Sequence, residues 1–160
     1  MDIQSLRALP KVELHRHLEC SLRPSTLREL LAASGQEVPK DAQAFSDLYL
    51  VMEPMNDLES VLRKFLATQT VLSTEKVLER ISFEAVEDAY LEGIRILELR
   101  YAPTFVQQGH EDMSFDQIHQ AIVKGVQRAE KQFPVAVGLI AIIQRILPAD
   151  SSLTRNDGIC

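Results

Sequence analysis

The chain has 160 residues, 46% of them hydrophobic and 25% charged, so it is long enough and apolar enough for one globular domain with a packed core. Its net charge of -6 and its isoelectric point near 5.2 argue against nucleic acid and anionic membranes as partners, because both attract basic surfaces. Its two cysteines cannot build a disulfide framework and its first residues lack a signal-peptide pattern, which together favour a cytoplasmic protein.

Predicted strands and helices alternate along the chain. The first strand is predicted at 11–18, where polar and apolar residues alternate, and a helix follows at 23–34, with Pro24 near its start and Gly35 beyond its end. Further helices are predicted at 45–50, 57–72, 73–92 and 114–132, with Asp57, Ser73 or Thr74, and Ser114 as N-caps.

Two more strands complete the pattern. They are predicted at 94–101, directly after Gly93, and at 135–143, a nearly continuous apolar run, with a loop at 104–113 between them. The order of strand, helices, strand, helix and strand predicts an α/β fold with a parallel sheet. Residues 149–160 are polar and are expected to form an irregular tail.

The first strand carries the residues that indicate chemistry. Because side chains alternate between the two faces of a strand, one face is expected to pack against helices and to hold Val12, Leu14 and Leu18. The other face is expected to hold Glu13, His15, His17 and Glu19.

The two histidines of this strand are predicted to bind a metal ion. Residues two apart on a strand lie roughly 6–7 Å apart at Cα, close enough for His15 and His17 to share one ion. Imidazole is a common ligand of zinc, and burying these polar groups is costly unless they are paired or bound to metal. An isolated His-x-His pair more often lies on the surface, so the prediction depends on the strand context. A catalytic zinc takes three protein ligands and a water, so the pair is part of a site.

The segment around the histidines is similar to a known family. Residues 9–19 read Leu-Pro-Lys-Val-Glu-Leu-His-Arg-His-Leu-Glu, with Ser-Leu-Arg-Pro at 21–24, and closely resemble the opening of the adenosine deaminase family within the amidohydrolase superfamily. Residues 98–103, Glu-Leu-Arg-Tyr-Ala-Pro, resemble the family's second strand, and 61–65 resemble the helix before it. Residues from 138 onward are similar to the third strand. The resemblance covers about residues 6–148, as an N-terminal portion of the family pattern.

The resemblance implies a fold and a site. Family members fold as a (β/α)8 TIM barrel with the active site at the carboxyl ends of the strands, and residues 1–160 are expected to hold about the first three strands. By resemblance, His15 and His17 are two ligands of a single Zn²⁺. Glu19 matches the acid that contacts the substrate through a ribose hydroxyl, and Phe65 matches an apolar wall of the substrate pocket.

The resemblance also implies a reaction, the hydrolytic removal of the 6-amino group of a purine. Adenosine is the first expectation for the substrate, and adenine or another 6-aminopurine is the alternative. The family's remaining zinc histidine, its catalytic Glu, and the His and Asp that orient the water lie on later strands, and no residue after 148 matches them. We therefore expect no catalytic residue in this chain and no activity from it alone. A non-catalytic truncated product and a different amidohydrolase are the other hypotheses.

Several further residues are assigned supporting or neutral roles. Glu98 and Arg100 are two apart on the second strand and are expected to share a face as an electrostatic support of the barrel interior. His110, in a polar loop, and His119, on an outer helix, are poor ligand candidates. Cys20 replaces the glycine that usually follows the acid in the family, and we expect the substitution to be tolerated.

Overall fold

A computed structural model describes residues 2–55 and 57–144. In chain order its elements are α1 (Ile3–Ala8), β1 (Lys11–His17), the 3-10 turn η1 (Leu18–Cys20), α2 (Pro24–Ala33), α3 (Ala42–Tyr49), α4 (Leu58–Gln69), α5 (Glu75–Leu91), β2 (Ile94–Tyr101), α6 (Pro103–Gln107), α7 (Phe115–Glu130) and β3 (Ala136–Ala141). The predicted tail at 149–160 lies outside the described residues.

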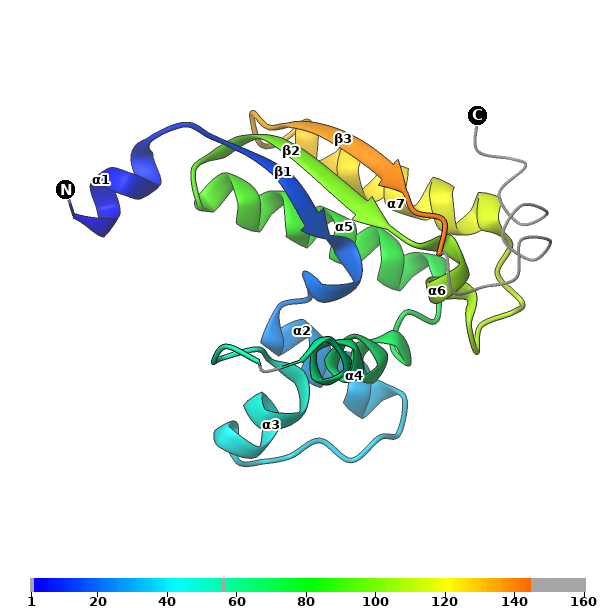
Figure 1. Cartoon of the computed structure of the whole chain (residues 1–160). Helices are drawn as coiled ribbons and strands as arrows, with labels where there is room; N and C mark the ends of the chain where they lie inside the picture. Colours follow the sequence, from blue (N-terminus) through cyan, green and yellow to red (C-terminus); the bar gives the residue numbers. More distant parts are fainter. Residues whose placement is uncertain (1, 56, 145–160) are drawn as a thin grey trace.

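A parallel sheet with the strand order β1-β2-β3 organises the described part of the chain. Helices α5 and α7 run along one side of this sheet, and α2, α3 and α4 gather in a separate group beside the carboxyl end of β1 (Figure 1). Parallel neighbours need a crossover connection, and the helices between successive strands provide it. The predicted parallel α/β architecture is therefore confirmed.

The main core lies between the sheet and helices α5 and α7. From β2, Leu97, Leu99 and Tyr101 point into it and are at most 1% exposed. They meet apolar side chains of the two helices, which are Leu78, Ile81, Ala85 and Ala89 from α5 and Ile118, Ala121, Ile122, Val126 and Ala129 from α7. The burial of these side chains from water is the main force that holds the helices on the sheet.

The opposite face of the sheet is exposed in the described part of the chain. Val12 and Leu14 of β1 are 56% and 57% exposed, although the alternation of the sequence placed them on the packing face. Ile96, the neighbour of Val12 in the β1-β2 register, is 49% exposed on the same face. The prediction for Val12 and Leu14 is therefore wrong, whereas Leu18, at 1% exposed in η1, is buried as expected.

Val12 precedes any change of face in β1, so its exposure reflects only that α5 and α7 cover the opposite side of the sheet (Figure 1). An irregularity in β1 then breaks the predicted alternation beyond Glu13. Glu13 pairs with Leu97 and Arg16 pairs with Leu99, so three steps along β1 correspond to two steps along β2. Such an extra residue is a β-bulge, and it shifts the alternation of all later side chains by one position. Glu13 and Arg16 consequently share the helix side of the sheet, where their side chains form an ion pair at 2.8 Å.

Helix boundaries follow the predicted caps closely. The side chain of Asp57 accepts a hydrogen bond from Ser60 N–H at the start of α4, and Thr74 accepts one from Val77 N–H at the start of α5. Ser114 and Gln117 form the predicted capping box of α7. Each cap pairs a backbone donor that a helix start otherwise leaves without an intrahelical partner.

Two short helices were not predicted. Helix α6 occupies the beginning of the predicted loop at 104–113, and Pro103 stands at its start, where the fixed φ of proline suits a helix. Helix α1 begins after Asp2, whose carboxylate accepts a hydrogen bond from Ser5 N–H. In the described part of the chain, no helix is both long enough and apolar enough to cross a membrane.

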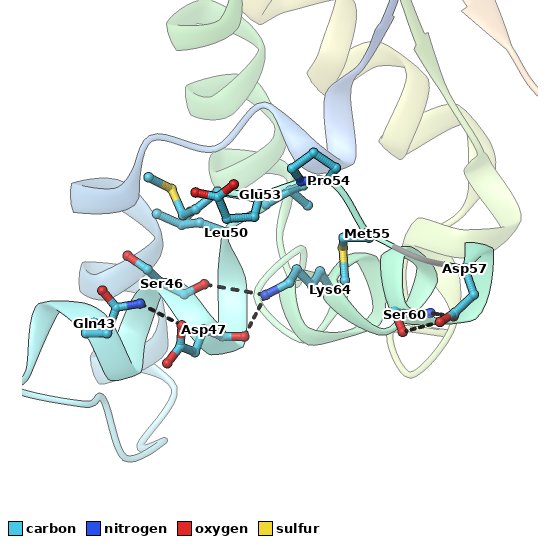
Figure 2. A pocket seen from close by; sticks show the side chains of 12 residues that line it. Gln43, Ser46, Asp47, Leu50, Glu53, Pro54, Met55, Asp57, Ser60 and Lys64 are labelled. Carbon is cyan, nitrogen blue, oxygen red and sulfur yellow. Dashed lines mark hydrogen bonds between the residues drawn. The ribbon is translucent and has the colours of Figure 1, made fainter.

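A lysine joins α3 to α4 outside the main core. The Nζ atom of Lys64 donates to the carbonyl oxygens of Ser46 and Asp47 at the carboxyl end of α3, at 3.4 and 2.6 Å (Figure 2). The carbonyl of Ser46 also accepts a hydrogen bond from Leu50 N–H at 2.9 Å. The ammonium group adds further hydrogen bonds and a positive charge at the carboxyl end of the helix, where a positive charge is stabilising. The hollow beside this lysine contains none of the predicted site residues.

A close helix contact generates a prediction for stability. A Cβ atom at Gly125 of α7 would lie 2.2 Å from the carbonyl oxygen of Glu79 and 2.8 Å from Cβ of Ser82, both in α5. Gly125→Ala is therefore expected to lower the free energy of unfolding by about 1–3 kcal/mol through overpacking. Gly138→Ala, whose new Cβ would lie 3.8 Å from Cγ of Glu98, is the control and should change it by less than about 1 kcal/mol. Urea unfolding measures both, and equal losses would contradict the prediction.

Candidate metal and substrate site

The two histidines of β1 lie together at the carboxyl end of the strand. The ring centroids of His15 and His17 are 5.3 Å apart, with 43° between the ring planes. Phe65 of α4 approaches the second ring edge-on, with its centroid 5.6 Å from that of His17. His17 and Phe65, which are 48 positions apart in the sequence, therefore meet at one end of the sheet, where parallel α/β proteins place their chemistry.

His17 favours its neutral form. Burial lowers its pKa, and the nearby His15 and Arg100 lower it further because each disfavours a second positive charge. A neutral imidazole has a lone pair for a metal ion, whereas a protonated imidazole does not. The lowered pKa therefore favours the form of this ring that can accept a hydrogen bond or a metal ion.

Glu19 is a buried acid next to this pair. Glu19 is 2% exposed, and its Oε1 atom accepts a hydrogen bond from Ala102 N–H at 2.5 Å. Its Oε2 atom is buried without a hydrogen-bond partner in the described part of the chain and lies 4.0 Å from Nδ1 of His17. Burial raises the pKa of the carboxyl to about 7, and the hydrogen bond from Ala102 opposes the rise. An acceptor oxygen is therefore available for a ligand.

An apolar hollow opens beside these groups. It has a volume of about 360 Å³ and combines His17 and Glu19 with side chains of α4 and α6, which are Leu62, Phe65, Leu66 and Phe105. Ligand sites commonly join apolar walls with a few polar groups that fix orientation. The hollow therefore joins apolar walls from α4 and α6 to a polar end formed by His17 and Glu19.

The donor set fits part of a zinc site. His15 and His17 provide two imidazoles at converging positions, and zinc accepts such nitrogen ligands. Within residues 2–55 and 57–144, no cluster of three or more His, Cys, Asp or Glu side chains is arranged to hold a metal ion. If this pair holds a catalytic zinc, the described residues would therefore supply at most two of the three protein ligands that such an ion requires.

The remaining predicted residues lie on β2 and α7. Glu98 and Arg100 are half-buried on β2, and His17 is the register partner of Arg100. Arg100 forms no ion pair within the described residues, and its Nη2 atom instead donates to the carbonyl oxygen of Leu14 at 2.9 Å. His119 accepts or donates a hydrogen bond at 2.6 Å to the hydroxyl of Tyr101, on the helix side of the sheet.

The backbone at Cys20 has an ordinary conformation. All described non-glycine residues have a negative φ, so this position does not need the left-handed conformation that glycine adopts most easily. The cysteine ends η1 as an exposed free thiol. The backbone geometry thus gives no reason why a side chain should be excluded there.

Sequence reasoning did not identify two parts of this site, the amide of Ala102 and the leucines of α4. The amide of Ala102 is a backbone group, and nothing in the residue type predicts its bond to Glu19. Leu58, Leu62 and Leu66 recur every fourth residue of α4 and are 71%, 47% and 52% exposed. This exposed row of leucines is visible in the sequence as a four-residue repeat, and it could have indicated the apolar wall of the hollow.

Comparison with known proteins places this arrangement in a family. The profile of the adenosine deaminase family matches residues 10–156. The chain belongs to the adenosine deaminase family. It is 38% identical over 144 residues to an adenosine deaminase of Vibrio atlanticus, a match that covers 90% of this chain and 43% of the relative. The chain thus spans less than half the length of the curated relatives that it matches.

Solved structures show the same fold. A cog1816 amidohydrolase from Burkholderia ambifaria, solved with bound Zn, superposes with a TM-score of 0.79 at 29% identity, over 93% of this chain and 40% of that protein. The adenine deaminase of Arthrobacter aurescens gives a TM-score of 0.79 at 25% identity, over 96% and 45%. The predicted class, a (β/α)8 barrel represented here by its first three parallel strands, is confirmed.

The buried acid generates a prediction. Glu19→Gln keeps an acceptor for Ala102 N–H and removes a buried charge, so the free energy of unfolding is expected to stay equal or to rise. Glu19→Ala leaves that N–H unpaired and is expected to lower the free energy of unfolding by about 1–3 kcal/mol. Chemical denaturation of both variants at neutral pH measures the difference. Equal losses in the two variants would show that the charge itself stabilises the fold.

Proposed function

We propose that this chain forms part of a zinc-dependent deaminase that hydrolyses a 6-aminopurine, with adenosine as substrate and inosine as product. Membership of the adenosine deaminase family supports the reaction class. The observation that carries the proposal is the convergence of His15 and His17 beside a buried acid and an apolar hollow. The closing groups of the site are expected from later strands of the barrel, so the 160 residues alone are expected to be inactive.

Each of the named residues has a role in this proposal. His15 and His17 would hold Zn²⁺ through ring nitrogens. Bound zinc lowers the pKa of a water molecule, which makes hydroxide available near neutral pH. Glu19 accepts a hydrogen bond from the substrate, from a ribose hydroxyl if the substrate is a nucleoside. Phe65 packs against the purine and helps to exclude bulk water from the reacting end of the ring.

A second substrate deserves a test alongside adenosine. Similarity to the adenine deaminase of Arthrobacter aurescens supports the free base adenine as an alternative. The two substrates differ at the ribose, so Glu19→Gln is expected to weaken the use of adenosine more than that of adenine. We further propose that the protein acts in the cytoplasm on a small molecule, without a nucleic-acid or membrane partner, which agrees with its net charge of -6.

Zinc content and turnover test the proposal. The complete gene product that contains these residues is expected to bind one zinc per site and to convert adenosine to inosine. His15→Ala and His17→Ala each remove a ligand and are expected to lose zinc and at least about 100-fold in turnover. His110→Ala, a histidine on a separate loop, is the matched control and should keep both.

Two outcomes would overturn the proposal. The first is a folded, metal-free protein that releases ammonia from none of adenosine, adenine and other 6-aminopurines. The second is full zinc content and turnover in both histidine variants. Measurable zinc-dependent turnover by the 160 residues alone would contradict the expectation that they are inactive.

The apolar wall gives a separate prediction. Phe65→Ala is expected to raise KM for adenosine about tenfold or more, because the lost apolar contact is worth about 1.5–3 kcal/mol. Phe133→Ala removes an aromatic ring of equal size that stacks on Tyr90, with centroids 5.3 Å apart, and serves as the control. The control is expected to lower stability without changing KM, and equal KM values in both variants would contradict a role of Phe65 in binding.

A further inference from the structure

The β-bulge in β1 determines which way His17 points. In a regular strand, Glu13 and His17 are four residues apart and share a face, which here would be the helix side of the sheet. The bulge adds one residue between Glu13 and Arg16, so the later side chains exchange faces. His17 is therefore on the open face, next to Arg100 in the register, and not against α5.

The extra residue also brings the two rings together. Leu14 and His15 lie inside the bulge and have no partner in the β1-β2 register. A bulge bends its strand and can redirect a side chain, which is why bulges recur beside active sites. The 5.3 Å separation of the His15 and His17 rings thus depends on a local backbone geometry that the regular pairing of strands does not impose.

Arg100 reaches this bulge from the neighbouring strand. Its Cα is the register partner of His17, and its Nη2 atom donates to the carbonyl oxygen of Leu14 at 2.9 Å. The side chain therefore spans the segment from His17 back to the bulged residue. Its hydrogen bond fixes a carbonyl that belongs to the irregular part of the strand, and so fixes the peptide that links Leu14 to His15.

A role restricted to stability explains this arrangement poorly. The Nε atom of Arg100 is buried without a hydrogen-bond partner in the described part of the chain, which costs free energy. An aliphatic side chain at this position would avoid this cost, so stability alone does not explain an arginine here. The expected electrostatic support by Glu98 does not account for the arginine either, since the two side chains form no ion pair among the described residues.

We propose that Arg100 is a positioning residue for the histidine pair. It acts through the carbonyl of Leu14, which it holds so that the bulge keeps His15 and His17 at the separation and angle suited to one metal ion. The inference rests on the proposed metal-binding role of the two histidines. It assigns the arginine no contact with the metal or the substrate.

The test uses variants of the complete gene product. Arg100→Met keeps the length of the aliphatic stem and removes the donors, whereas Arg100→Lys retains a donor. Arg95→Met is the matched control, because Arg95 lies on the same strand and donates to the carbonyl oxygens of Tyr90 and Ile94 at 3.2 and 2.9 Å, away from the histidines. Zinc affinity is measured by competition with a chelator. The ring signals of the histidines are measured by NMR on the metal-free protein.

Arg100→Met is expected to weaken zinc binding about 10- to 100-fold, as loss of an outer partner of metal ligands usually does. It is also expected to shift the ring signals of His15 and His17, but not that of His110. Arg100→Lys should recover part of the affinity, and Arg95→Met should match the wild type in both measurements. Urea midpoints separate this effect from a general loss of stability, which both methionine variants would share.

Wild-type zinc affinity together with unchanged histidine signals in Arg100→Met would overturn the inference. If that variant does not fold, Arg100→Gln decides, because its side chain ends two bonds short of the Nη2 position that reaches Leu14. Weaker zinc binding at a wild-type urea midpoint supports the role, and wild-type affinity with unchanged signals overturns it. If the wild-type protein takes up no zinc, the proposed function fails. The NMR comparison on metal-free protein then still decides whether Arg100 positions the histidines.

Discussion

The parallel pairing of β1 with β2 is the constraint on which the candidate site depends. Strand β2 is fixed in the core by Leu97 and Leu99, which are fully buried against the helices. Its partner β1 is therefore held in a defined register, and the carboxyl ends of both strands lie at the same edge. The turn after β1 then carries Glu19 to the amide of Ala102, which directly follows β2.

The groups at this edge are costly for the fold. A carboxylate that is 2% exposed, with one oxygen unpaired among the described residues, opposes folding unless a ligand or another part of the protein completes its hydrogen bonds. A half-buried imidazole with a lowered pKa adds a second group whose charged form is disfavoured. Such perturbed groups gather at functional sites more often than elsewhere, and here they coincide with the motif that the family shares.

Local signals allowed the sequence to predict most of the elements, because caps and breakers act within a few residues. Asp57, Ser114 and Gly93 mark helix ends that the structure confirms, and the bounds of β2 agree residue for residue. The faces of β1 were not predictable, because one extra residue at the bulge reverses the alternation beyond it. The histidine pair could be predicted from the motif. Its surroundings could not, because they are formed by a helix, a turn and a backbone amide that are distant in sequence.

Gly125 marks the closest contact described between helices α5 and α7. At this position the backbones of α5 and α7 approach so closely that no side chain fits between them, and a contact of this kind has no room for rearrangement. The two helices and the buried side of the sheet should therefore hold the amide hydrogens that exchange most slowly with solvent. The histidines lie toward the other side of the same sheet. A ligand bound there would therefore rest on a support whose helix contacts leave no room for rearrangement.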